Sequence, residues 1–154
     1  MHLMCLGVIW VGWSWFAVVT AVVLYLIRMF AITGFYHRYF SHNSFKTNRF
    51  WQFCFAVLGN SSVQRGPLWW AAHHRHHHRY ADTEKDIHSP SRHGFIWSHV
   101  GWLTSPANFP TKMQYVKDWA RFPELRWINR FDIVVPVLLA VALFVGGSLL
   151  AIYA

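Results

Sequence analysis

Two long runs without a charged residue constrain this chain most. No charged side chain occurs from Leu3 to Ile27, and none occurs from Ile133 to Ala154. About 20 apolar residues are enough for a helix to cross the hydrocarbon core of a bilayer, and both runs reach that length. The sequence therefore predicts an all-α integral membrane protein.

The charged and aromatic residues support this interpretation. Charged residues make up only 13% of the 154 residues, and ten residues are tryptophan, which gathers at membrane–water interfaces. All 14 Lys and Arg residues lie between Arg28 and Arg130. The positive-inside tendency predicts that this middle segment is cytoplasmic. Its basic residues stand singly among aromatics, without a helix-turn-helix or zinc-finger pattern, which argues against nucleic-acid binding.

The first apolar run is interrupted at "GWSW", Gly12 to Trp15. One helix from Leu3 to Tyr36 would measure roughly 50 Å, more than a bilayer core requires. We therefore expect one partial domain, 1–154, with a turn at this point. Its expected membrane segments are at about 3–13, 16–36 and 132–153, and its cytoplasmic cap is at about 37–130. Within the cap we expect an interfacial or re-entrant helix within 50–63, a weak amphipathic helix at 111–122 and a short helix starting at "FPEL".

Histidine is concentrated in one short stretch. Five of the eleven histidines fall within "HHRHHH", residues 73–78. Positions i, i+3 and i+4 share one face of a helix, so two sets can converge, and spacing does not choose between them. The two sets are His74, His77 and His78, or His73, His76 and His77.

A second pair of histidines, His37 and His42, occurs in "HRYFSH". Five residues correspond to about 140° around an ideal α-helix, so the two side chains would not share a face. They can meet where a helix end unwinds, or each can serve a different metal ion.

Clustered imidazoles suit iron, zinc, copper or nickel. The two cysteines, Cys5 and Cys54, stand alone in apolar stretches, and we expect them to be packing residues rather than disulfide partners or thiolate ligands. Asp82, Glu84 and Asp86 follow the histidines and can hydrogen-bond metal-bound imidazoles. The sequence thus predicts a transition-metal site at the membrane surface.

Four motifs, "HRYFSH", "HRHHH", "DTEKDIHSP" and "SHVGW", together resemble the membrane-bound fatty-acid desaturases, specifically the delta-9 (stearoyl-type) branch. The resemblance covers essentially the whole chain. It implies a small helical bundle under a cytoplasmic cap that holds two irons and uses O2. It also implies a cis double bond introduced into a long saturated acyl-CoA or acyl-lipid, with electrons from cytochrome b5, ferredoxin or rubredoxin.

The resemblance assigns roles to individual residues. Because the second box of the family reads H-R-x-H-H, the implied iron ligands are His37, His42, His74, His77 and His78. Gln64 and Trp70 match positions that line the acyl tunnel, although an aromatic residue there can equally be a packing residue. Supporting contacts around the ligands are expected from Asp82, Asp86, His88 and Arg92.

The chain departs from the family pattern in two ways. Animal acyl-CoA desaturases carry an Arg-Asp pair before the second box and a basic pair after "SHVGWL", where this chain has Ala72-His73 and Thr104-Ser105-Pro106. "QRGP", residues 64–67, is similar to bacterial and cyanobacterial members, so the acyl carrier stays open. No third histidine box follows the last apolar run. Two irons need on the order of ten ligand positions, and the two boxes present supply five of them. We expect a fragment, or half of a split enzyme, that is inactive alone.

Two other functions stay open at this point. A di-iron membrane hydroxylase acting on fatty acyl chains or alkanes would form an alcohol instead of an alkene. A non-enzymatic, histidine-rich membrane protein would carry metal or bind haem, and a bound haem would give an absorption band.

Overall fold

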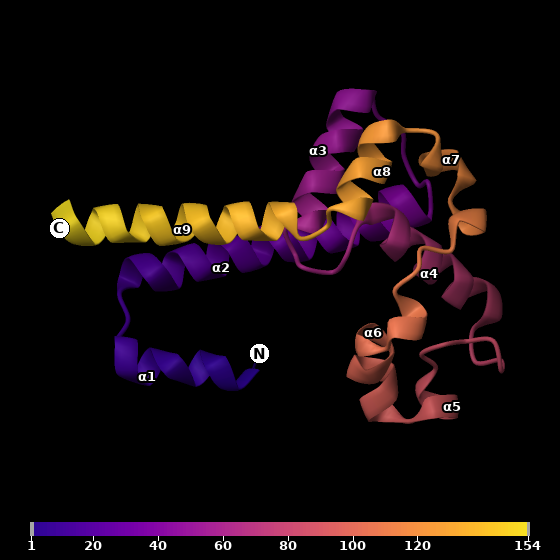
Figure 1. The fold of residues 1–154 in the computed structure, drawn as a ribbon, viewed down its shortest axis with the longest axis horizontal. Coiled ribbons are helices and arrows are strands. Elements are labelled where there is room, and N and C mark those ends of the chain that lie inside the picture. The colour runs from indigo at the N-terminus through magenta and orange to yellow at the C-terminus, as the bar shows by residue number, and fades with distance from the viewer. Residues whose placement is uncertain (1, 154) are drawn as a thin grey trace.

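The computed structural model describes residues 2–153, and every element of secondary structure in that range is helical (Figure 1). The all-α class predicted from the sequence is confirmed. The predicted domain, 1–154, reaches one residue beyond the described range at each end.

The N-terminal segment is short and turns where "GWSW" predicts a break. A 3-10 helix, η1 (His2–Gly7), runs into α1 (Val8–Val11). The chain then reverses at Gly12, whose φ of 76° is a left-handed conformation that glycine adopts without strain. The next helix, α2 (Trp15–Phe30), is capped by Ser14, whose hydroxyl accepts the Ala17 N–H at 3.1 Å.

The second helix is longer than the sequence predicts. α2 passes directly into η2 (Ala31–Ser41), a π-helix, so one helix extends from Trp15 to Ser41 instead of ending near Tyr36. Its 27 residues are long and apolar enough to cross a membrane. α8 (Pro123–Arg130) and the first 17 residues of α9 (Val134–Tyr153) pass the same test together, with a bend of 66° between them.

The remaining helices form the cap. α3 (Arg49–Asn60) begins at Asn48, whose side chain accepts the Trp51 N–H at 3.0 Å. α4 (Pro67–Tyr80) begins with a proline, which suits the first turn of a helix. Short elements follow: α5 (Pro90–His93), η3 (Trp97–Gly101), α6 (Trp102–Thr104), η4 (Pro106–Asn108), η5 (Met113–Tyr115) and α7 (Lys117–Ala120).

The helix predicted across 111–122 is wrong. That segment contains only η5 and α7, separated at Val116, whose φ of −131° and ψ of 32° are not helical. The Tyr115 carbonyl accepts the Arg75 Nη1 at 2.8 Å instead of an N–H of its own helix. α8 begins at Pro123, where "FPEL" predicts a short helix.

The buried core lies where η2, α3, α4 and α8 meet, at one end of the long α2–η2 helix (Figure 1). Tyr36 is at its centre, and its hydroxyl donates to the carbonyl oxygens of Ala56 and Arg65 at 3.4 and 3.2 Å. The tyrosine ring lies against the backbone of Gly59, which has no side chain to displace it. This packing holds η2 beside α4, the two elements that carry the predicted histidine ligands.

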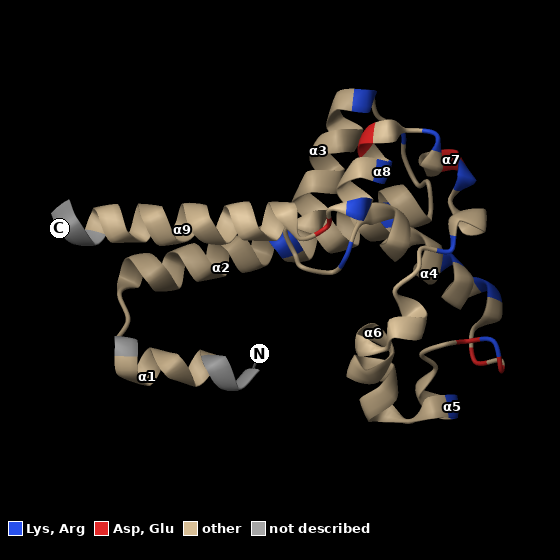
Figure 2. Cartoon of the chain, in the orientation of Figure 1, with Lys and Arg blue, Asp and Glu red and all other residues tan. Residues whose placement is uncertain are grey.

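Charged residues gather around this core end of the molecule (Figure 2). The described part of α9 has no charged residue, and α2 has one, Arg28 in its last turn. The polar cap and the two apolar helices therefore occupy different parts of the structure.

Candidate metal centre

The π-helical form of η2 brings His37 and His42 together. In a π-helix the backbone N–H bonds to the carbonyl five residues earlier, and the His42 N–H donates to the His37 carbonyl at 3.2 Å. Residues five apart then lie on one face, and the two Nε2 atoms are 3.1 Å apart. His42 is the C-cap residue of η2, so the two histidines meet at a helix end, as the sequence allowed, and both belong to one group of possible metal ligands.

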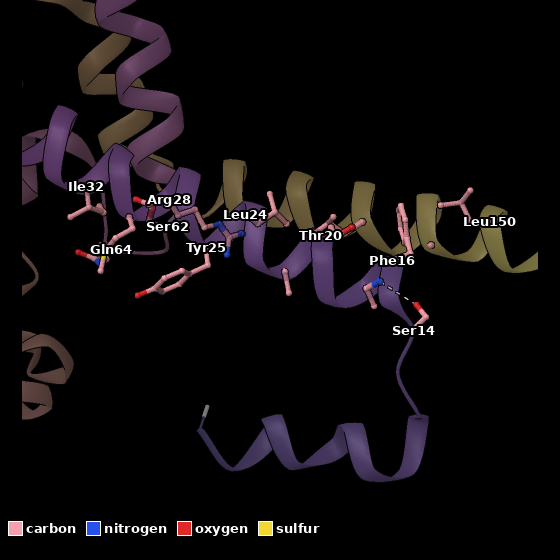
Figure 3. Close-up of a pocket in the computed structure, with 15 residues that line it drawn as sticks. Ser14, Phe16, Thr20, Leu24, Tyr25, Arg28, Ile32, Ser62, Gln64 and Leu150 are labelled. Atoms are coloured by element: carbon pink, nitrogen blue, oxygen red, sulfur yellow. Dashed lines mark hydrogen bonds between the residues drawn. The ribbon is translucent and has the colours of Figure 1, made fainter.

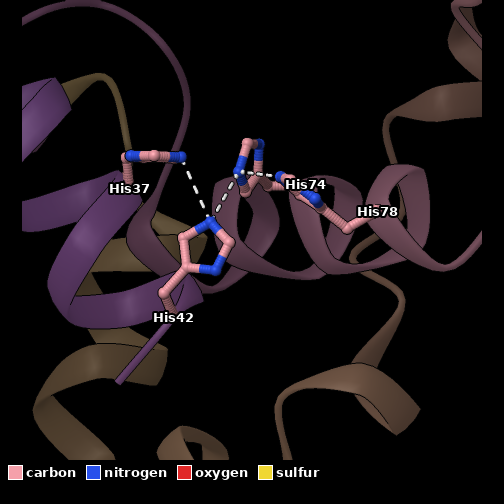
Figure 4. A group of neighbouring side chains, drawn as sticks. All are labelled: His37, His42, His74 and His78. Carbon is pink, nitrogen blue, oxygen red and sulfur yellow. Dashed lines mark hydrogen bonds between the residues drawn. The ribbon is translucent and has the colours of Figure 1, made fainter. Parts of the chain in front are cut away.

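Helix α4 supplies two further imidazoles. His74 and His78 lie one α-helical turn apart, and their Nε2 atoms are 3.0 Å from each other. The His42 Nε2 is 3.3 Å from the His74 Nε2, which joins the two pairs (Figure 4). His37, His42, His74 and His78 form one group, the histidine tetrad, with one ligand atom from each within 4.8 Å of the others.

The arrangement of the four imidazoles suits a bound metal ion better than it suits hydrogen bonds between the imidazoles. A neutral imidazole has one N–H and one acceptor nitrogen, so a ring nitrogen that faces two others cannot satisfy both. The Nε2 atoms of His42 and His74 each face two others. A cation held at about 2.1 Å from each nitrogen would place neighbouring donors about 3 Å apart, close to the observed spacing.

The environment of His74 and His42 favours the neutral imidazole, which is the form that binds metals. Burial, followed by the charges of His78 and His37, lowers the pKa of His74 to about 3. Burial and the neighbouring His37 also lower the pKa of His42. Ligand nitrogens at these positions are therefore available at neutral pH.

His77 is not part of the tetrad. Its Nδ1 lies 3.1 and 3.0 Å from the two carboxylate oxygens of Asp86, and the His88 Nδ1 lies 3.6 Å from the same carboxylate. These three residues form a second group able to hold a metal ion. The Asp86 contact also fixes the orientation of His77 and leaves its Nε2 free, as carboxylate partners do for metal-bound histidines.

The loop after α4 is organised around Asp86, which is fully buried. Its carboxylate accepts the backbone N–H of Asp82 at 3.0 Å and that of His88 at 3.3 Å. Burial works to raise the pKa of Asp86, but the hydrogen bond from His77 and those from the backbone hold it below its usual value. An ionised carboxylate at this position keeps His77 and His88 on the same side of the loop.

Asp82 and Arg92 lie farther from the histidines. The Asp82 carboxylate accepts the hydroxyl groups of Ser89 and Ser91, and its carbonyl oxygen accepts the Arg92 Nε at 3.1 Å. These bonds close the loop on itself. Both residues therefore contact the loop, and their hydrogen bonds do not reach the tetrad.

The two remaining histidines of the cluster point elsewhere. His73 is 1% exposed and packs against Trp69, with ring centroids 4.4 Å apart. His76 is also buried and packs against Tyr80 and Tyr115. The structure therefore unites His74 and His78 with the first pair and directs His73 and His76 into the packing.

Gln64 and Trp70 connect the tetrad to an apolar groove. The Trp70 ring stacks on His74, with centroids 4.7 Å apart, and its Nε1 donates to the Gln64 Oε1 at 3.1 Å. Gln64 in turn lines an open groove of about 1120 Å³ between α2 and α9 (Figure 3). Most of the groove is lined by apolar side chains such as Leu24 and Leu150.

Sequence reasoning missed the role of Arg75. Its side chain points away from the tetrad and binds Asp118 and the carbonyl oxygens at the end of η2. The only signal in the sequence was its place inside H-R-x-H-H. Asp118 lies 43 residues away and stands in no motif.

Comparison with known proteins gives a consistent result. Residues 13–154 match the fatty acid desaturase family. An sn-1 stearoyl-lipid 9-desaturase of Anabaena variabilis is 35% identical over 140 residues, which cover 88% of this chain and 51% of the relative. A palmitoyl-monogalactosyldiacylglycerol delta-7 desaturase of Arabidopsis thaliana is 33% identical over 139 residues, 88% of this chain and 37% of the relative. An acyl-CoA 5-desaturase of Anemone leveillei is 38% identical over 104 residues, 67% of this chain and 32% of the relative.

The chain spans about half the length of these relatives, or less. The names of the three relatives differ in the position of the double bond and in the acyl carrier. No solved structure matches the chain.

Proposed function

The chain belongs to the fatty acid desaturase family, and from this premise we propose that it holds iron with the histidines of η2 and α4 and presents a long acyl chain to that iron. The observation that carries the proposal is the convergence of four imidazole nitrogens from two helices. The proposed ligands are His37, His42, His74, His77 and His78. Asp86 and His88 are proposed to support His77.

The chemistry explains why a metal is required. A methylene group inside a saturated chain has no acidic proton and no leaving group, so side-chain acid–base catalysis does not remove its hydrogens. Two bound irons would supply this oxidation, with O2 as the co-substrate. The tasks of the protein itself are to orient the ligands, to exclude water and to decide which carbon lies beside the histidines.

The groove supports an acyl substrate. Its apolar lining lies between α2 and α9, the elements proposed to span the membrane, and it ends at Gln64. From there the indole of Trp70 leads to His74. An acyl tail that enters from the bilayer would pass from the groove to the tetrad along this path, with Gln64 and Trp70 as its contacts.

We propose the delta-9 position, a cis double bond and a stearoyl-type saturated chain on a lipid or on coenzyme A. The similarity to a stearoyl-lipid 9-desaturase supports this choice, while other relatives are named for positions 7 and 5. The electron donor is proposed to be a small cytoplasmic redox protein, such as cytochrome b5, ferredoxin or rubredoxin. The protein is proposed to be an integral membrane protein whose metal centre faces the cytoplasm.

Product analysis tests the proposal. The complete gene product is expressed in a host without its own acyl desaturase, and total fatty acids are identified by gas chromatography and mass spectrometry. We expect a new delta-9 unsaturated acid that disappears in His74→Ala and persists in Lys46→Ala, a control at an exposed residue outside both metal-binding groups. A hydroxylated product would identify a hydroxylase instead, and a haem absorption band without product would identify a haem protein.

A further inference from the structure

Arg75 joins two segments that are far apart in the sequence. Its Nε donates to the Ser41 carbonyl at 2.9 Å, and its Nη2 donates to the Phe40 carbonyl at 2.7 Å. Its Nη1 donates to the Tyr115 carbonyl at 2.8 Å. One guanidinium group therefore binds the end of η2 and the end of η5 at the same time.

Asp118 holds that guanidinium group in place. The two carboxylate oxygens accept from Nη1 and Nη2 of Arg75, both at 2.9 Å. The Asn43 amide also donates to Asp118, at 3.3 Å. The five hydrogen bonds donated by Arg75 use all five N–H groups of its guanidinium group. A lysine cannot reproduce this arrangement.

The bonded carbonyls are those that end the π-helix. The last carbonyl groups of a helix have no partner within it, and those of Phe40 and Ser41 directly precede His42. The Phe40 carbonyl also accepts the Trp119 Nε1 at 2.7 Å. The turn that presents His42 is thus fixed from outside by Arg75 and by the residues around Asp118.

This matters because His42 reaches His37 only through the π-helical turn. In an α-helix the two residues would point about 140° apart. We infer that Arg75 and Asp118 are positioning residues, which hold the end of η2 so that the His42 imidazole faces His37 and His74. The inference rests on the proposed metal centre and adds to it two residues that touch no metal.

A purely stabilising ion pair is the alternative, and the chain offers a matched control for it. Arg49 and Glu124 form a second two-pronged pair, with both N–O distances 2.7 Å, which joins α3 to α8. The recorded hydrogen bonds of the Arg49 side chain all go to Glu124, and none goes to a carbonyl of η2. Loss of this pair removes a similar contact without releasing the π-helix end.

The test is a Co(II) titration of the purified chain in detergent, followed by the ligand-field absorption bands. Arg75→Lys keeps the positive charge and loses the guanidinium group. Asp118→Asn removes the carboxylate charge that holds this guanidinium group in place. We expect both variants to bind Co(II) at least about tenfold more weakly and with altered bands, as for loss of a contact that orients a ligand. Arg49→Lys and Glu124→Gln should keep the affinity and spectrum of the parent chain.

The outcomes separate the inference from the proposed function. If the parent chain binds no Co(II), the metal centre and the inference both fall. If the parent chain binds and both Arg75→Lys and Asp118→Asn match it in affinity and spectrum, only the inference falls. Helical content from circular dichroism identifies a variant that has not folded. If Arg75→Lys fails in this way, Asp118→Asn, which keeps the arginine and removes only the charge of the carboxylate that holds it, decides the question.

Discussion

The Nε2 atoms of His37 and His42 lie 3.1 Å apart because the helix that carries both residues winds as a π-helix. The same two residues on an α-helix would face different directions. The five-residue spacing of the first histidine motif therefore brings the two imidazoles together only when the helix is a π-helix. The contribution proposed for each imidazole of the pair can be measured by a single substitution.

Substitution of His42 should remove metal binding by the tetrad. The His42 Nε2 faces both His37 and His74, so His42→Ala takes out the link between the two helices. We expect Co(II) affinity of the purified chain to fall by more than about tenfold, as loss of a ligand costs at least as much as loss of its supporting partner. Isothermal titration measures the affinity, with Lys46→Ala, at an exposed position outside both metal-binding groups, as the control. Equal affinity in His42→Ala would contradict the tetrad.

Substitution of Asp86 tests the second group. Asp86→Asn keeps the size of the side chain but removes the ionised carboxylate that accepts from His77 Nδ1 at 3.0 Å. We expect iron content per chain of the complete gene product to fall, with affinity about 10- to 100-fold weaker. Glu84→Gln, at an exposed position of the same loop, is the control. Iron content that stays at the parent level would show that Asp86 does not orient a ligand.

Buried histidines should make the metal-free chain sensitive to mild acid. Burial, followed by the charge of Lys112, lowers the pKa of His73 to about 4. Between about pH 6.5 and 4 the unfolded chain therefore binds a proton that the folded chain does not, so stability is lost as the pH falls through this range. Protonation of this residue lowers the free energy of unfolding by at most about 1.4 kcal/mol per pH unit.

Thermal unfolding in detergent with a chelator, followed at pH 7.5 and pH 5, measures this effect. His73→Phe keeps an aromatic ring against Trp69 and cannot take up the proton. We expect a smaller loss of stability between the two pH values in the variant. The same loss in both proteins would show that His73 is not buried in its neutral form.

Much of the fold could be predicted from local sequence signals. The absence of charge identified two long apolar helices, and Gly12 and Ser14 marked the turn between the first two segments. In the histidine cluster, the i to i+4 spacing of His74 and His78 holds in the structure. These features depend on neighbouring residues, which a single sequence displays directly.

The rest depends on contacts between distant segments. The π-helix has no local signature, and its end is bound by Arg75 and Trp119, 35 and 79 residues away from Phe40. The same arginine takes the Tyr115 carbonyl, which explains why the helix expected across 111–122 is interrupted. The sequence could not show that His77 belongs with Asp86 and His88 and not with the tetrad.

The packing of η2 on α3 should be sensitive to a single methyl group. A Cβ at Gly59 would lie 2.1 Å from the Tyr36 ring, which is buried and held by two hydrogen bonds. Gly59→Ala should therefore destabilise the chain by about 1–3 kcal/mol. Gly146→Ala is the control, since nothing lies within 4 Å of its Cβ position. Thermal unfolding of both variants in detergent measures the difference, and equal stability would contradict the packing.

The contact between Trp70 and Gln64 should affect the substrate without affecting the metal. Trp70→Phe keeps a ring beside His74 and loses the N–H that donates to Gln64. We expect unchanged Co(II) binding, and a yield of unsaturated product lower by on the order of tenfold, because the acyl chain would be held less well beside the histidines. Trp97→Phe is the control, because it loses a similar indole hydrogen bond, to the Ile87 carbonyl, away from the groove. If Trp70→Phe kept the full yield, or lost Co(II) binding along with it, Trp70 would be a packing residue of the metal centre and not a substrate contact.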